Sequence, residues 1–156
     1  MTDSWWVKNA RDLEWTSNEM GEYCLLAADE FAIDLNVLGR GQPMALYHHE
    51  PHQEGFFVLR GECDVTVEGE THRLRDWDYF HCPPGAAHVL VGAGDEGALV
   101  LAVGSRVGPD GGAYPVDATA LKHGAGVEVE TANAGAEYAR FGPLVSSTYP
   151  EGLLPE

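Results

Sequence analysis

Short runs of apolar or alternating residues dominate the middle of the chain, and turn residues such as Gly, Pro and Asp separate them. Runs of this length predict β-strands, because a half-buried strand alternates its side chains with a period of two. The predicted strands cover residues 22–26, 33–38, 44–50, 55–59, 63–67, 72–74, 78–82, 88–91 and 98–103, with a loop at 92–97. Eight or nine short strands favour an all-β sandwich or a closed jelly-roll barrel.

The N-terminal part differs from this strand-rich part. Residues 1–20 are mostly polar but contain Trp5, Trp6 and Trp15, and they lack the alternation of a core strand. We expect an arm whose aromatic residues plug one end of the barrel or contact a second subunit.

The C-terminal part predicts two short helices on the outside of the barrel, at 116–123 and 132–141. Asp117 near the start of the first pattern and Thr131 just before the second are the expected N-caps, and glycines follow both patterns. The 156 residues fit one domain with an arm (1–20), a barrel (about 21–105) and a tail (about 106–156).

Charge and cysteine content limit the expected binding partners and cellular location of the protein. The formal net charge of −16 repels phosphate backbones and anionic lipids, so we expect neither nucleic acid nor a membrane as partner. No apolar run approaches the roughly 20 residues of a membrane span, and the N-terminus lacks a signal-peptide pattern. Three cysteines without a paired spacing predict reduced thiols, and the expected location is cytoplasmic.

The segment from Tyr47 to Glu54 is the richest in candidate chemistry. It holds three imidazoles and two carboxylates within eight residues, as YHHEPHQE. On an unbroken strand, His48, Glu50, His52 and Glu54 would share one face. Imidazole and carboxylate together suit Fe, Mn, Zn, Ni or Co as the divalent ion, and we expect one such ion in the barrel.

Two motifs in this region resemble the cupin superfamily. The first cupin motif has the form G-x5-H-x-H-x3–4-E-x6-G, and its second half is present as EGFFVLRG, from Glu54 to Gly61. The second motif, G-x5-P-x-G-x2-H-x3-N, matches from Trp77 through Pro83 to His88. Fifteen residues separate Gly61 from Trp77, as in compact microbial members. The stretch is also similar to uncharacterised bacterial cupins with WDxxHCPxG here.

The resemblance implies a jelly-roll barrel with His48, Glu50, Glu54 and His88 as metal ligands, and glutamate takes the place of the second motif histidine. A second register would put Tyr47 and His49 in the two histidine places, and both registers remain open from the sequence. Trp77 stands where the family has glycine. The resemblance also favours a homodimer.

Four neighbouring residues have weaker roles in this interpretation. His49 and His52 are less favoured ligands, because His49 would face outward and His52 follows Pro51, where a bulge or turn is expected. Tyr47 and His81 are candidates for acid–base catalysis, although packed positions are favoured for both.

Three functions agree with these residues. The first is a metal-dependent enzyme for a small organic substrate, with the metal as Lewis acid; the family implies dioxygenase, isomerase or lyase chemistry without selecting among them. The second is a binding or sensor module for a small-molecule ligand. The third is a metal-free acid–base cupin of the epimerase type.

Overall fold

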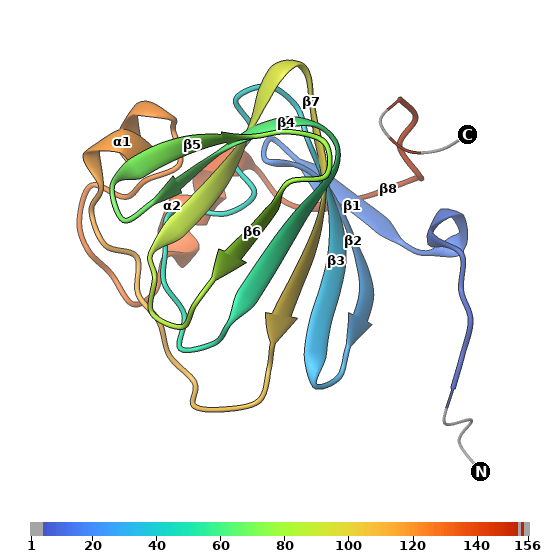
Figure 1. The fold of residues 1–156 in the computed structure, drawn as a ribbon, viewed down its shortest axis with the longest axis horizontal. Helices are drawn as coiled ribbons and strands as arrows, with labels where there is room; N and C mark the ends of the chain where they lie inside the picture. Colours follow the sequence, from blue (N-terminus) through green and yellow to red (C-terminus); the bar gives the residue numbers. More distant parts are fainter. Residues whose placement is uncertain (1–4, 153, 155–156) are drawn as a thin grey trace.

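The computed structural model describes residues 5–152 and 154, and its strands wrap into an antiparallel barrel (Figure 1). The strands are β1 (Trp15–Asn18), β2 (Gly21–Ala28), β3 (Phe31–Leu38), β4 (Glu54–Val67), β5 (Glu70–Leu74), β6 (Tyr79–Cys82), β7 (His88–Ser105) and β8 (Val145–Ser147). Their order is β5-β4-β7-β3-β2-β1-β8, and β6 pairs with β4. The predicted all-β jelly roll is confirmed.

Two long strands, β4 and β7, connect the two halves of the barrel. The first half of β4 pairs with β6 and with residues 98–104 of β7, and its second half pairs with β5 and residues 88–93. Side chains along β4 alternate, so Phe56 and Val58 enter the buried core while Phe57 faces the other way. The barrel interior is therefore lined by every second residue of these strands.

The predicted loop at 92–97 is wrong in detail, because these residues belong to β7. The pairing register jumps there, so that Gly61 lies opposite Ala98 and Glu62 opposite Ala93. Gly61 and Gly97 have φ angles of 85° and 78°, and a Cβ on Gly61 would collide with the carbonyl oxygen of Gly97. Glycine at both places lets the strands cross this bulge closely.

The predicted strand at 44–50 is also wrong. This segment is irregular and makes only isolated bridges, in which His48 pairs with His88 and His49 with Ala113. Proline on either side of the segment, at 43 and 51, has no N–H for a ladder. The segment therefore lies between β7 and the tail as a connector rather than as a full strand.

The expected arm is shorter than 1–20, because Trp15 begins β1, which pairs with β2 and β8. The Trp15 side chain is fully buried beside Cys24 and Leu35, and its Nε1–H donates to the carbonyl of Ala10, 2.9 Å away. Residues 10–12 form a short 3-10 helix, η1 (Ala10–Asp12).

Trp5 and Trp6 remain 75% and 53% exposed on the N-terminal segment, which extends away from the barrel at the right of Figure 1. The polar start of the expected arm, residues 1–4, lies outside the described residues.

The tail forms α1 (Ala118–Lys122), α2 (Gly135–Tyr138) and η2 (Ala139–Phe141), and the two α-helices lie at the left of Figure 1. The Asp117 cap is confirmed, since its Oδ1 accepts from the N–H of Ala120 at 2.8 Å. The Thr131 cap is wrong, because the Thr131 hydroxyl bonds only to Asn133 and the helix begins later. Within the described residues, no helix has the length and apolarity that a membrane crossing requires.

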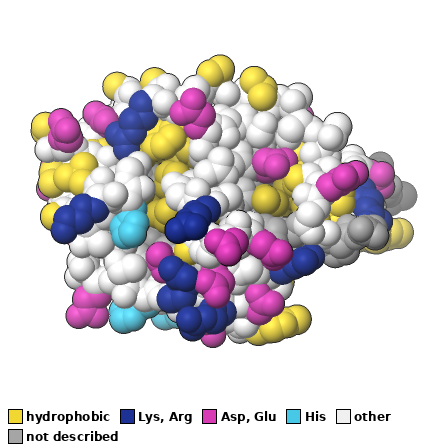
Figure 2. All heavy atoms as spheres, turned by 90° about the horizontal axis from the view of Figure 1, so that it is seen from above, with side chains coloured by type: hydrophobic (Ala, Val, Ile, Leu, Met, Phe, Trp, Pro, Cys, Tyr) yellow, Lys and Arg dark blue, Asp and Glu magenta, His cyan; other side chains and the backbone are white. Residues whose placement is uncertain are grey.

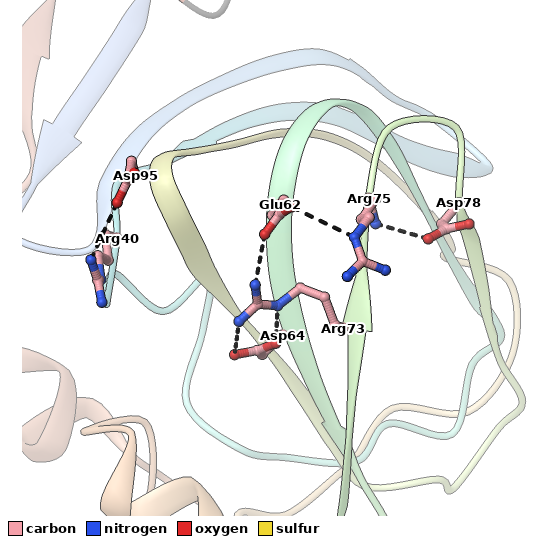
Figure 3. Close-up of polar contacts among 7 residues, drawn as sticks. All are labelled: Arg40, Glu62, Asp64, Arg73, Arg75, Asp78 and Asp95. Atoms are coloured by element: carbon pink, nitrogen blue, oxygen red, sulfur yellow. Dashed lines mark hydrogen bonds and ion pairs between the residues drawn. The ribbon is translucent and has the colours of Figure 1, made fainter.

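On the face shown in Figure 2, Lys and Arg side chains lie among Asp and Glu side chains. On the β4–β5 hairpin, Arg73 contacts Glu62 and Asp64, both at 2.6 Å, and Arg75 Nε lies 3.6 Å from Glu62 (Figure 3). These arginines therefore neutralise acids outside the barrel.

Candidate metal centre

A cavity of about 220 Å³ inside the barrel contains His48, Glu54 and His88. One ligand atom from each of the three lies within 4.8 Å of the other two. His48 comes from the irregular connector, Glu54 is the first residue of β4, and His88 is the first residue of β7. Three separate segments must therefore be in place before these groups meet.

The backbone bridge between His48 and His88 explains why the two imidazoles adjoin. Each residue donates its N–H to the other's carbonyl, at 3.2 and 2.9 Å, and the ring centroids are 5.1 Å apart. Glu54 completes the group, since its Oε2 lies 3.2 Å from His88 Nε2. Phe56 and Phe80 pack against the His88 ring, with centroids at 5.3 and 5.9 Å, and His88 is only 1% exposed.

Both imidazoles have a backbone carbonyl beside Nδ1. His48 Nδ1 lies 2.6 Å from the oxygen of Leu46, and His88 Nδ1 lies 3.1 Å from the oxygen of Ala86. A carbonyl only accepts, so Nδ1–H is the donor and each Nε2 keeps its lone pair for the cavity. Metal-binding histidines are commonly oriented in this way.

The pKa values at the site reflect burial next to like charges. Burial, together with the charge of Glu50, raises the pKa of Glu54 to about 7. Burial, and then the neighbouring His48, lowers the pKa of His88 to about 4. The pKa of His48 is raised, since its contacts with Glu50, the Leu46 carbonyl and Glu54 outweigh the opposing effect of burial. A divalent cation would relieve the repulsion between the carboxylates.

Glu50 lies at the rim of this group. Its Oε1 is 3.6 Å from His48 Nε2, and 43% of its side chain is exposed. The contact with His48 lowers the pKa of Glu50. Glu50, the fourth residue of the predicted ligand set, therefore lies close enough to orient His48 but outside the group of His48, Glu54 and His88.

The alternative register is not favoured by the geometry. Tyr47 is 4% exposed and packs with Ala87 and Val89 in a core cluster, and it does not itself line the cavity. His49 bonds through its backbone to Ala113 and is absent from the cavity lining. Within the described residues, Tyr47 thus lacks the contact with the cavity that an acid–base role would need.

His52 and His81 also lie apart from the trio. His52 follows the bend at Pro51 and lines a neighbouring pocket that shares Glu54, so the common strand face expected from the sequence ends before it. His81 is exposed on β6, with Nδ1 3.5 Å from Gln53 Nε2, and does not line the cavity. The packed position expected for His81 is therefore wrong, and its catalytic role stays a prediction.

Sequence reasoning missed the wall that faces the trio. Asp34, Asn36 and Tyr23 line the same cavity from β2 and β3. The Asn36 amide donates to Asp34 Oδ1, and burial raises the pKa of Asp34 to about 6. The signal was present in FAIDLNVL, where two polar residues at a spacing of two interrupt an apolar strand and must face the same side.

The tail reaches the site through two tyrosines. The Tyr114 ring packs on His48 with centroids 5.6 Å apart, and Tyr138 meets Tyr114 edge-on. The Tyr138 hydroxyl accepts from the N–H of Leu46 at 3.1 Å, and the carbonyl of Leu46 accepts from His48. Residues far along the chain thus help to orient one imidazole.

Comparisons with known proteins agree with this fold. The family model of the cupin domain matches residues 37–104. A curated relative, quercetin 2,3-dioxygenase of Bacillus subtilis, is 37% identical over 60 residues. That match covers 38% of this chain and 18% of the relative, so most of the relative has no counterpart in it.

Two solved structures resemble most of the chain. A sugar phosphate isomerase from a cupin superfamily, from Silicibacter pomeroyi, has a TM-score of 0.65 at 20% identity, covering 83% of this chain and 94% of that one. An RmlC-like cupin from Shewanella frigidimarina has a TM-score of 0.58 at 21% identity, covering 67% and 94%. At these identities the likeness extends to the fold alone.

Proposed function

Since the chain is a member of the cupin superfamily, whose barrel here encloses two imidazoles and a carboxylate, we propose that it is a metal-dependent enzyme acting on a small organic substrate. One divalent ion, of Zn, Mn, Fe, Ni or Co, would be held by His48, Glu54 and His88, with Glu50 at the rim. The reaction class beyond this is left open, because the dioxygenase relative matches only 60 residues.

The observation that carries the proposal is the orientation of the two imidazoles. Each Nδ1 faces a backbone carbonyl, so in the neutral imidazoles both Nε2 lone pairs are available on the side where Glu54 lies. A group that merely fills a core would have no need of two imidazole nitrogens directed at a buried carboxylate. When bound, a divalent ion there would act as a Lewis acid on an oxygen of the substrate.

The chain's own groups would supply the remaining chemistry. Asp34 lies in the same cavity, and its raised pKa, about 6, suits a carboxyl that gives and takes a proton near neutrality. Phe56 and Phe80 pack against His88 and would keep water from that side. Tyr114 would hold the plane of the His48 ring.

A second candidate function, metal-free acid–base catalysis, has one specific observation in its favour. The pKa of Glu54 is about 7, and a carboxyl of this kind beside two imidazoles could catalyse proton transfer without a metal. The binding or sensor function requires only the cavity, and no contact in the described residues selects it over the other two.

Metal titration separates these functions. Protein stripped with a chelator and titrated with zinc in a calorimeter should bind one ion per chain. His88→Ala should lose most of this affinity, and Glu54→Gln should weaken it while keeping nearly the same shape. His72→Ala is the matched control, because His72 lies on the outer hairpin with 58% of its side chain exposed. Equal affinity in all four proteins, or no binding to the wild type, would refute the metal proposal.

A further inference from the structure

The cavity with the metal trio adjoins a larger groove. The groove has a volume of about 490 Å³, and it shares Tyr23, Asn36 and Met44 with the cavity lining. The two spaces therefore adjoin at these three side chains. A groove of this size lies in the range that holds drug-sized ligands, whereas the cavity alone, about 220 Å³, is smaller than that range.

The groove is mainly apolar, and the tail forms one of its walls. Met20 and Leu38 contribute from the barrel side, and Ala139 and Leu144 from the tail. The tail lies outside residues 37–104, the part that matches the cupin domain. This wall is therefore a feature of the chain beyond the shared barrel.

The charge of the lining side chains disfavours phosphates in both spaces. No Lys or Arg is present among the described residues that line the cavity or the groove, whereas Glu22 lies in the groove and Asp34 in the cavity. Arg106 acts on Tyr23 from outside the lining, as the weakest of four influences on the tyrosine's pKa, of which burial is the largest. Glu54 and Asp34 in the cavity would offset the charge of the proposed ion, so a phosphate would lose its water shell there without gaining a Lys or Arg side chain as partner.

We infer that the cavity and groove together bind an uncharged molecule with an oxygen-bearing head and an apolar body. The head, a pair of hydroxyls or a hydroxyl beside a carbonyl, would enter the cavity next to Asn36, and the body would lie between Met44 and Leu144. This inference rests on the proposed function for the head, but the apolar body depends on the groove alone. One structural neighbour is described as a sugar phosphate isomerase, but sugar phosphates are disfavoured as ligands of this cavity and groove.

Two probes with the same head test the groove. Catechol and 4-butylcatechol differ only by an apolar tail, and glucose 6-phosphate serves as the charged comparison. Binding would be measured by calorimetry with zinc-loaded protein. Each buried methylene strengthens binding roughly fourfold, so we expect 4-butylcatechol to bind at least about tenfold more tightly than catechol. Equal affinity of the two catechols would overturn the groove assignment.

Two variants test whether the butyl group of 4-butylcatechol binds in the groove. Leu144→Asp places a charge in the groove at a side chain that is 63% exposed, so folding should be preserved, and it should abolish the gain from the butyl group. Val129→Asp is the matched control, because Val129 is an exposed apolar tail residue (76%) that lines neither space, and it should keep the gain. Loss of the gain in both variants would overturn the placement, as would glucose 6-phosphate binding more tightly than 4-butylcatechol.

Repeating the titration with metal-free protein separates this inference from the proposed function. A butyl preference that persists without zinc, with no effect of zinc on catechol, would support the groove and refute the metal site. Zinc-dependent catechol binding without a butyl preference would support the metal site and refute the groove.

Discussion

Replacing Asp34 by asparagine should stabilise the protein at neutral pH. Asp34 lies in the cavity wall, with its Oδ1 accepting from the Asn36 amide, and no ion pair among the described residues includes it. Asparagine has nearly the same shape and keeps an oxygen for this hydrogen bond. The substitution therefore removes the buried charge and little else.

The size and the pH range follow from the pKa of Asp34, which burial raises from 3.8 to about 6. A shift of roughly two units corresponds to about 3 kcal/mol, and partial exposure of the side chain reduces the expected gain to about 1–3 kcal/mol. Because the folded state holds the Asp34 proton more tightly than the unfolded chain, the contribution of Asp34 to stability is highest below the unfolded pKa. It falls as pH rises towards 6 and then levels off. The variant lacks this fall.

Urea denaturation of chelator-treated wild type and Asp34→Asn at pH 5, 6, 7 and 8 would measure the difference. The stability advantage of the variant should grow up to about pH 7 and then stay constant. Asp95→Asn is the control, since the Asp95 side chain is 99% exposed, and its difference from wild type should not change with pH. A variant advantage that is independent of pH, or a variant less stable at pH 8, would show that Asp34 is not a buried, destabilising charge.

Three further predictions follow from other parts of the molecule. Tyr138→Phe leaves the N–H of Leu46 without its acceptor, so thermal unfolding should show a loss of about 1–3 kcal/mol in stability. Calorimetry should show a weaker zinc affinity. Unchanged stability and affinity would disprove the link from the tail to the site. The three cysteines are buried and free, and burial raises the pKa of Cys63 and of Cys82 to about 12. Iodoacetamide at pH 8 should therefore label none of them in the native protein and all three after denaturation without reductant. A pair protected from labelling would reveal a disulfide. The exposed Trp5 and Trp6 lead us to propose a homodimer, which sedimentation would detect. Deletion of residues 1–8 should convert the dimer to a monomer, and a full-length monomer at high concentration would contradict the proposal.

Most of the strands could be predicted because the alternation of apolar and polar residues is local. The runs that became β2, β3 and β5 needed no information beyond their own residues and turns. The segment at 44–50 alternates equally well but became a connector, because its partners are the start of β7 and the distant tail. Which neighbour a segment meets is a property of the whole chain, so local periodicity could not reveal it.

The candidate site was predictable only as far as the motif spacing extended. His48, Glu54 and His88 are brought together by the structure, and spacing had singled out all three. Asp34 has no motif partner in sequence, and it faces the trio only because β3 lies beside β7 in the barrel. Tyr138 reaches Leu46 across 92 positions, a contact that tertiary packing alone creates.

X-ray absorption of the zinc-loaded protein tests the central claim most directly. We predict one zinc per chain with two imidazole nitrogens and one or more carboxylate oxygens in its coordination shell. Sulfur should be absent, although Cys82 Sγ lies only 3.2 Å from His88, because that contact is on the Nδ1 side of the ring. A spectrum with a sulfur ligand or fewer than two imidazoles, or a protein that retains no zinc, would contradict the proposed metal centre.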